Sequence, residues 1–100
     1  MAHSGLQKEV IALYRRALRM AHNKPPLARP KFSLFVRYTF KTQSSSISPR
    51  EVSAIEHLLR KGKRQIEMYE DPKVKDCWVS QEMRDWAVRH REGRRTPELN

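Results

Sequence analysis

The apolar residues in the first quarter of the chain recur at the spacing of an amphipathic helix. They follow the i, i+3, i+4, i+7 series that places side chains on one face of a helix: Leu6, Val10, Leu13, Tyr14, Ala17, Leu18 and Ala21. Ser4 and Gln7 have the spacing of a capping box at its start. The prolines from Pro25 onward cannot continue a helix. We therefore predict a first helix that begins near Ser4 and ends around residues 22–24.

A second, shorter helix is predicted from about residue 30 to residue 42. Four apolar residues lie on one side of this helix: Phe32, Phe35, Val36 and Phe40. Leu34 and Tyr38 fall elsewhere on the helical wheel, where they fill gaps in the packing, lie exposed to solvent or form a partner surface. A serine-rich link over residues 43–46 is predicted to follow this helix.

The clearest helix start in the chain lies at Ser48. Ser48 and Glu51 have the spacing of a capping box, and Pro49 suits the first turn. An apolar stripe follows, and the helix should end at Asp71. Gly62 falls in the middle of that stripe, where glycine costs about 1 kcal/mol relative to alanine. Either another group packs closely against Gly62, or the helix tolerates one unfavourable residue.

The helical pattern weakens after Pro72. Ser80 suits the cap of a short final helix with Met83, Trp86 and Ala87 on one face, and residues 89–100 are charged and predicted to be disordered. The predicted fold is all-α. It is an antiparallel three-helix bundle over residues 1–72, with a weakly structured C-terminal extension over residues 73–100.

The charge balance indicates an anionic partner. The 100 residues carry 21 Lys and Arg against 11 Asp and Glu, a net charge of +10. Such a field attracts nucleic acid, an anionic membrane surface or an acidic protein, although the same balance can serve solubility alone. No apolar stretch approaches the ~18 residues that a membrane span needs. A single cysteine, Cys77, excludes an internal disulfide.

The residue pattern indicates no catalytic or metal chemistry. The histidines are scattered, and with the lone Cys77 they do not form a zinc or iron–sulfur site. The chain has no Gly-rich phosphate loop, nucleophile elbow or paired carboxylates in a pocket-forming context. Glu67 and Glu70 are expected to form ion pairs within the third helix. We expect no cofactor, no metal site and no enzymatic activity.

Two basic surfaces are predicted on the solvent side of the helices. Lys8, Arg15 and Arg19 project from the first helix, opposite its apolar stripe. The third helix carries the run Arg60-Lys61-Gly62-Lys63-Arg64, within which no acid is interleaved. Arginine suits carboxylate recognition, so an acidic protein segment is a natural ligand. A basic nucleic-acid-binding module is the alternative, but the run lacks interleaved aromatics and no recognition helix stands out.

The tripeptide Leu13-Tyr14-Arg15 resembles the signature of the LYR-motif family. Phe40 matches the phenylalanine that closes the second helix in that family, and the likeness covers about residues 5 to 70. Ser48-Pro49-Arg50, and the run from Arg60 to Arg64 followed by Gln65, are most similar to the members that help assemble succinate dehydrogenase.

The resemblance implies a chaperone of the mitochondrial matrix that binds the iron–sulfur subunit of succinate dehydrogenase and promotes insertion of its cluster. It assigns Arg60, Lys61, Lys63 and Arg64 to the client. It assigns Leu13, Tyr14, Arg15 and Phe40 to a J-type co-chaperone or to acyl carrier protein. Arg15 points away from the apolar stripe, so it is the motif residue best placed for a partner. Within the family, the alternative is an assembly factor or subunit of another respiratory complex bound to acyl carrier protein.

Overall fold

The computed structural model describes residues 5–48 and 50–94. Ser4, Pro49 and residues 95–100, on which some of the predictions fall, lie outside the described residues. Within that part all regular elements are helices: α1 (Gly5–His22), α2 (Arg29–Ser45), α3 (Val52–Glu70) and α4 (Gln81–Arg94). The all-α prediction is confirmed for these residues. A three-helix bundle is an incomplete description, because a fourth helix packs on α2.

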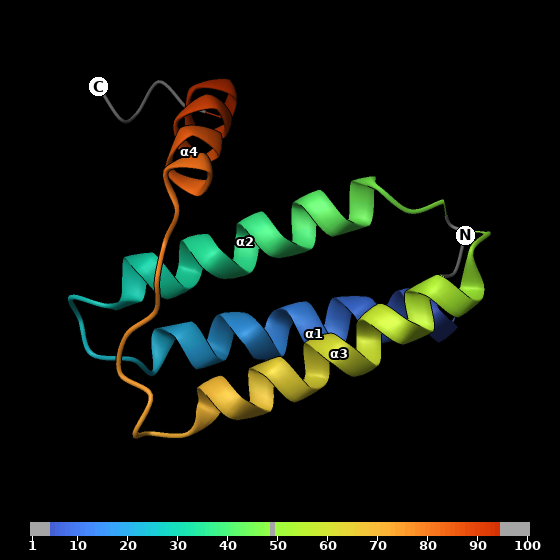
Figure 1. Ribbon diagram of the computed structural model, residues 1–100, viewed down its shortest axis with the longest axis horizontal. Helices are drawn as coiled ribbons and strands as arrows, with labels where there is room; N and C mark the ends of the chain where they lie inside the picture. The colour runs from blue at the N-terminus through green and yellow to red at the C-terminus, as the bar shows by residue number, and fades with distance from the viewer. Residues whose placement is uncertain (1–4, 49, 95–100) are drawn as a thin grey trace.

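The helix α1 packs against both α2 and α3, and α4 packs against α2 only (Figure 1). In the figure α1 and α3 run in the same direction and α2 runs opposite to both, while α4 stands at a steep angle to α2 on the side away from α1 and α3. Small side chains allow the close approach, since Ala17 and Ala21 are fully buried on α1. Phe32 of α2 is also fully buried and joins the same core cluster as Ile66 of α3. No helix in the described ranges is long and apolar enough to cross a membrane.

The helix α2 continues through most of the serine-rich segment that was predicted to be a link. It ends at Ser45 rather than at residue 42. The hydroxyls of Thr42, Ser44 and Ser45 donate hydrogen bonds to carbonyl oxygens three or four residues earlier, at 2.7 to 3.2 Å. These bonds satisfy the hydroxyls within the helix, so residues 43–45 extend it.

The helix α3 begins later than its sequence signal indicated. Its first helical residue is Val52, and Ser48 is not its N-cap. Only one half of the predicted capping box forms, since the Ser48 N–H donates to Oε1 of Glu51 at 2.8 Å. The Ser48 hydroxyl oxygen instead accepts from the N–H of Arg50 at 3.2 Å. The two bonds fix a turn ahead of the helix rather than its first turn.

Residues 73–94 of the C-terminal extension are described by the structure, and their helix, α4, packs on α2. Ser80 accepts a hydrogen bond from the Met83 N–H at 3.1 Å, which confirms the predicted cap of the final helix. Trp86 is buried against Tyr38, with ring centroids 5.7 Å apart. The His90 ring stacks on Trp86 at 4.1 Å. Disorder from Arg89 onward was therefore a wrong prediction for residues 89–94, which continue α4.

Candidate partner-binding surfaces

The first two residues of the Leu-Tyr-Arg motif face the other helices. The Tyr14 ring packs edge-on against the Phe40 ring, with centroids 5.1 Å apart and planes at 61°. A Cβ atom placed on Gly62 would lie 3.3 Å from Cδ2 of Leu13, so α1 and α3 approach closely at that point. The structure thus brings Tyr14 to Phe40 and Leu13 to Gly62, and both motif side chains take part in helix packing.

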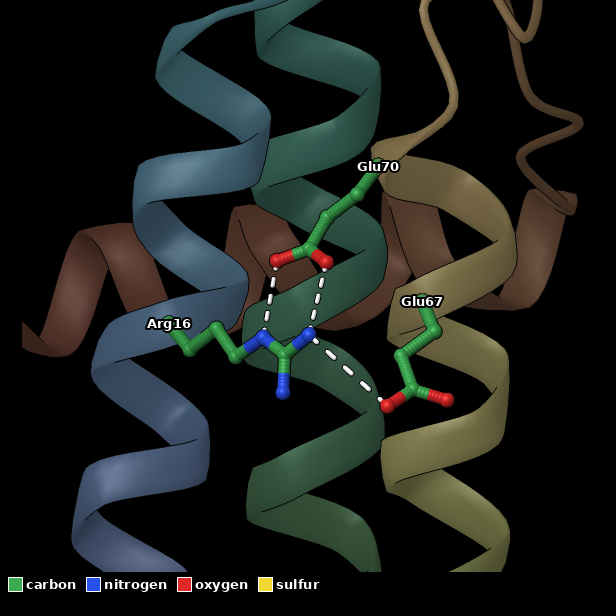
Figure 2. Close-up of polar contacts among 3 residues, drawn as sticks. All are labelled: Arg16, Glu67 and Glu70. Carbon is green, nitrogen blue, oxygen red and sulfur yellow. Dashed lines mark hydrogen bonds and ion pairs between the residues drawn. The ribbon is translucent and has the colours of Figure 1, made fainter.

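The two consecutive arginines of the motif region have different surroundings. Arg15 is exposed and has no hydrogen bond or ion pair with another described residue. Arg16 donates two hydrogen bonds to the Glu70 carboxylate, both of 2.8 Å, and lies 3.9 Å from Glu67 (Figure 2). Arg16 therefore ties α1 to α3, while the charge of Arg15 remains available to a partner.

The Arg16 clamp corrects the expectation that Glu67 and Glu70 pair within α3. Their partner lies across the helix interface because the face of α3 that carries both carboxylates turns toward α1. The hydrogen bonds from Arg16 hold the pKa of Glu70 below its usual value, and they raise the pKa of Arg16. Sequence reasoning missed this clamp, although the position of Arg16 beside the α1 stripe was a usable signal.

The basic run of α3 is displayed to solvent. Arg60, Lys61, Lys63 and Arg64 are all exposed. None of the four forms an ion pair with a carboxylate in the described part of the chain. A helix holds the four charges in fixed order, so they present a preformed cationic surface to an acidic ligand.

An apolar groove opens between α1, α2 and α3, with a volume of about 640 Å³. α2 and α3 meet where the Tyr69 ring packs edge-on against Phe32 and Phe35, with ring centroids 5.9 and 5.4 Å apart. Among the described residues, α1 packs closely on both α2 and α3, but the backbones of α2 and α3 do not approach each other closely. The apolar lining of the groove includes Leu6, Val10, Ile11, Leu13, Phe35, Phe40, Ile47, Val52, Ile55, Leu58 and Leu59. Periodicity assigned many of these residues to a filled core, so the groove was missed.

Lys61 and Gly62 also line this groove. The groove and the basic run of α3 are therefore adjacent, and a ligand with an apolar chain and an anionic group could contact both. Among the residues that the structure describes, no group of three His, Cys, Asp or Glu side chains is placed to hold a metal ion.

The Leu-Tyr-Arg motif on the first helix and Phe40 on the second are the residues that carried the LYR resemblance, although Phe40 does not close α2, which ends at Ser45. The family model described as Complex 1 protein (LYR family) matches residues 8–68. The chain therefore belongs to the LYR family.

The chain is also similar to curated proteins named succinate dehydrogenase assembly factor 1, mitochondrial. It is 46% identical to the one from Schizosaccharomyces pombe over 80 residues, which cover 80% of this chain and all of the relative. It is 37% identical to the one from Saccharomyces cerevisiae over 71 residues, 71% of this chain and 89% of the relative. The Dictyostelium discoideum protein named assembly factor 1A is 43% identical over 72 residues, 70% of this chain and 78% of the relative. No solved structure matches the chain.

Proposed function

We propose that this protein is a non-catalytic assembly factor of the mitochondrial matrix that binds the iron–sulfur subunit of succinate dehydrogenase and promotes insertion of its cluster. The proposal is supported by the names of its relatives and by one observation in particular. Four exposed cations on α3 have no carboxylate partner in the described residues. The iron–sulfur cluster is cargo delivered to the client, and this chain supplies no ligand to it.

The surface formed by Arg60, Lys61, Lys63 and Arg64 binds an acidic segment of the client. Guanidinium groups pair with carboxylates through two parallel hydrogen bonds, which fixes the orientation of the bound segment as well as its position. Holding the client this way keeps it in solution before it docks to its partner subunit.

The Leu-Tyr-Arg region recruits the J-type co-chaperone that delivers the cluster. Arg15 makes the contact, because its side chain is exposed and its charge is unpaired among the described residues. Leu13, Tyr14 and Phe40 act by fixing the position of α1 through packing. The co-chaperone and the client then occupy different helices and can be bound together.

The test is a pull-down from mitochondria with the tagged protein, read by mass spectrometry. The variant Arg60→Glu/Arg64→Glu should recover the iron–sulfur subunit about tenfold less well or worse, because like charges then face the client. The matched control is Arg84→Glu/Arg89→Glu, which makes the same charge change at two exposed residues of α4. Equal recovery by both variants and the parent protein would contradict the assignment of the surface.

The apolar groove favours a second candidate partner, an acylated acyl carrier protein. A volume of about 640 Å³ lies within the ~300–1,000 Å³ typical of ligand pockets, and the lining is mostly apolar. An acyl chain would occupy the groove against Leu13 and Phe40, while the anionic carrier contacts Lys61 at its edge. Intact-mass analysis of the protein purified from mitochondria tests this: a co-purifying carrier with an acylated phosphopantetheine supports it, and a carrier-free protein contradicts it.

A further inference from the structure

A second cavity lies at the end of the molecule where the α1–α2 connection meets the end of α3. Its volume is about 900 Å³. Five cationic side chains line it, and the one carboxylate is Glu70. The cations are Arg16, Arg19, Lys24, Arg29 and Lys75.

Two of these cations already form hydrogen bonds within the protein. Arg16 is paired with Glu70. Lys24 is buried, and its amine donates to the carbonyl oxygens of Asp71 and Val74 at 3.2 and 2.5 Å. The buried ammonium still contributes positive potential to the cavity, since carbonyl partners do not cancel its charge.

The other three cations are available to a ligand. Arg19, Arg29 and Lys75 are exposed, and none forms an ion pair within 4.0 Å of a carboxylate among the residues described. Arg19 contributes only to the electrostatic lowering of the Glu70 pKa, whose main cause is Arg16. The Arg29 Nε atom donates to the Lys24 carbonyl at 2.9 Å, which leaves its terminal nitrogens for another acceptor. Three exposed cations that line one concave surface suit a phosphate group, which carries more charge and more acceptor oxygens than a single carboxylate.

The α1–α2 connection that borders this cavity displays one large apolar side chain. Leu27 is 93% exposed, although its neighbour Ala28 is buried. Pro25 and Pro26 line the cavity. The turn is fixed by hydrogen bonds from the N–H groups of Ala28 and Arg29 to the Pro25 carbonyl, at 2.9 and 3.1 Å. The leucine is thus held out from the protein beside the cationic cavity.

We propose that this end of the molecule docks on an anionic phospholipid surface. Lipid phosphates enter the cavity beside Arg19, Arg29 and Lys75, and Leu27 inserts into the outer acyl layer. A stable protein interface buries on the order of 800 Å² per partner, and a single leucine beside a cavity supplies little of that area. Binding to a membrane surface needs less contact area, because each basic residue near anionic lipids strengthens binding about fivefold. One buried leucine adds about tenfold.

The test is sedimentation of the full chain with phosphatidylcholine vesicles that contain about 25% phosphatidylglycerol or none. Wild-type protein should bind only the anionic vesicles. Leu27→Ser should weaken binding about tenfold, and Arg19→Gln/Lys75→Gln about twentyfold. Arg84→Gln/Arg89→Gln, which removes the same charge from α4, should change it less than about twofold. Far-UV circular dichroism confirms that each variant is folded.

Three results would overturn the proposal. Equal weakening by the two double variants would mean that binding reflects net charge alone. Unchanged binding of Leu27→Ser, together with complete displacement of the protein by inorganic phosphate, would make the cavity a site for a soluble anion. Failure of the wild type to bind anionic vesicles while it binds polyglutamate would assign the surface to an acidic protein.

Discussion

Replacement of Gly62 by alanine should stabilise the protein by about 0.5 kcal/mol. Alanine gains about 1 kcal/mol over glycine in a helix interior. Against that gain, the new Cβ would lie 3.3 Å from Cδ2 of Leu13, slightly closer than ordinary van der Waals contact. The Leu13 side chain is half-buried and lines the apolar groove, so it can shift by a few tenths of an ångström into free space. We therefore expect roughly half of the propensity gain to survive.

Urea unfolding followed by circular dichroism measures this change, and thermal unfolding should show a midpoint raised by about 2–4 °C. A double-mutant cycle isolates the contact. In a Leu13→Ala background the Cβ meets no leucine, so Gly62→Ala should there give the full gain of about 1 kcal/mol. Destabilisation by Gly62→Ala in the parent protein would refute the argument that Leu13 can move. The same gain in both backgrounds would show that Leu13 is not the neighbour that matters.

Other changes have effects that follow from burial and pairing. Phe32→Ala should cost about 3–5 kcal/mol in unfolding free energy, because the ring is fully buried, and urea titration would show a much earlier midpoint. Glu70→Gln should cost about 0.5–1 kcal/mol near neutral pH, since the pair with Arg16 is about a third exposed and partly screened. The pKa of Glu70 is lowered in the folded state. The stability that the Arg16–Glu70 pair contributes is therefore complete above the unfolded pKa of Glu70, and it is lost as the pH falls through the folded pKa. The difference in unfolding free energy between Glu70→Gln and the parent protein should vanish in strong acid. Burial, and secondarily Asp76, raises the pKa of the Cys77 thiol, so a thiol reagent at mildly alkaline pH should label the folded protein more slowly than the urea-unfolded protein.

The ends of the helices could be predicted where proline or apolar periodicity decides them. α1 ends at His22, shortly before Pro25 and within the predicted range, and α3 ends at Glu70, directly before Asp71. The predicted end of α2 was too early, because Ser44 and Ser45 satisfy their hydroxyls inside the helix. The predicted start of α3 was also too early, since side-chain hydrogen bonds that fit a helix cap also fit a separate turn.

The candidate site was only partly accessible to sequence reasoning. Periodicity placed Arg15 on the solvent side, and the basic run from Arg60 to Arg64 was evident from the order of residues along the chain. The Arg16–Glu70 clamp joins residues 54 positions apart, and its geometry depends on how α1 and α3 align. The groove depends on the separation of α2 from α3, which the apolar stripes of individual helices do not specify. Lys24 was likewise missed, because a buried lysine is rare unless carbonyl oxygens surround it.

The central claim is tested most directly by succinate dehydrogenase activity in Saccharomyces cerevisiae mitochondria from cells that lack their own relative of this protein. The chain is expressed there behind a yeast import sequence, beside the Arg60→Glu/Arg64→Glu and Arg84→Glu/Arg89→Glu variants at matched levels. Restored activity with the parent chain and the α4 control, and its loss with the α3 variant, is the predicted result. Absence of any restored activity from folded, imported parent protein would contradict a role in succinate dehydrogenase assembly.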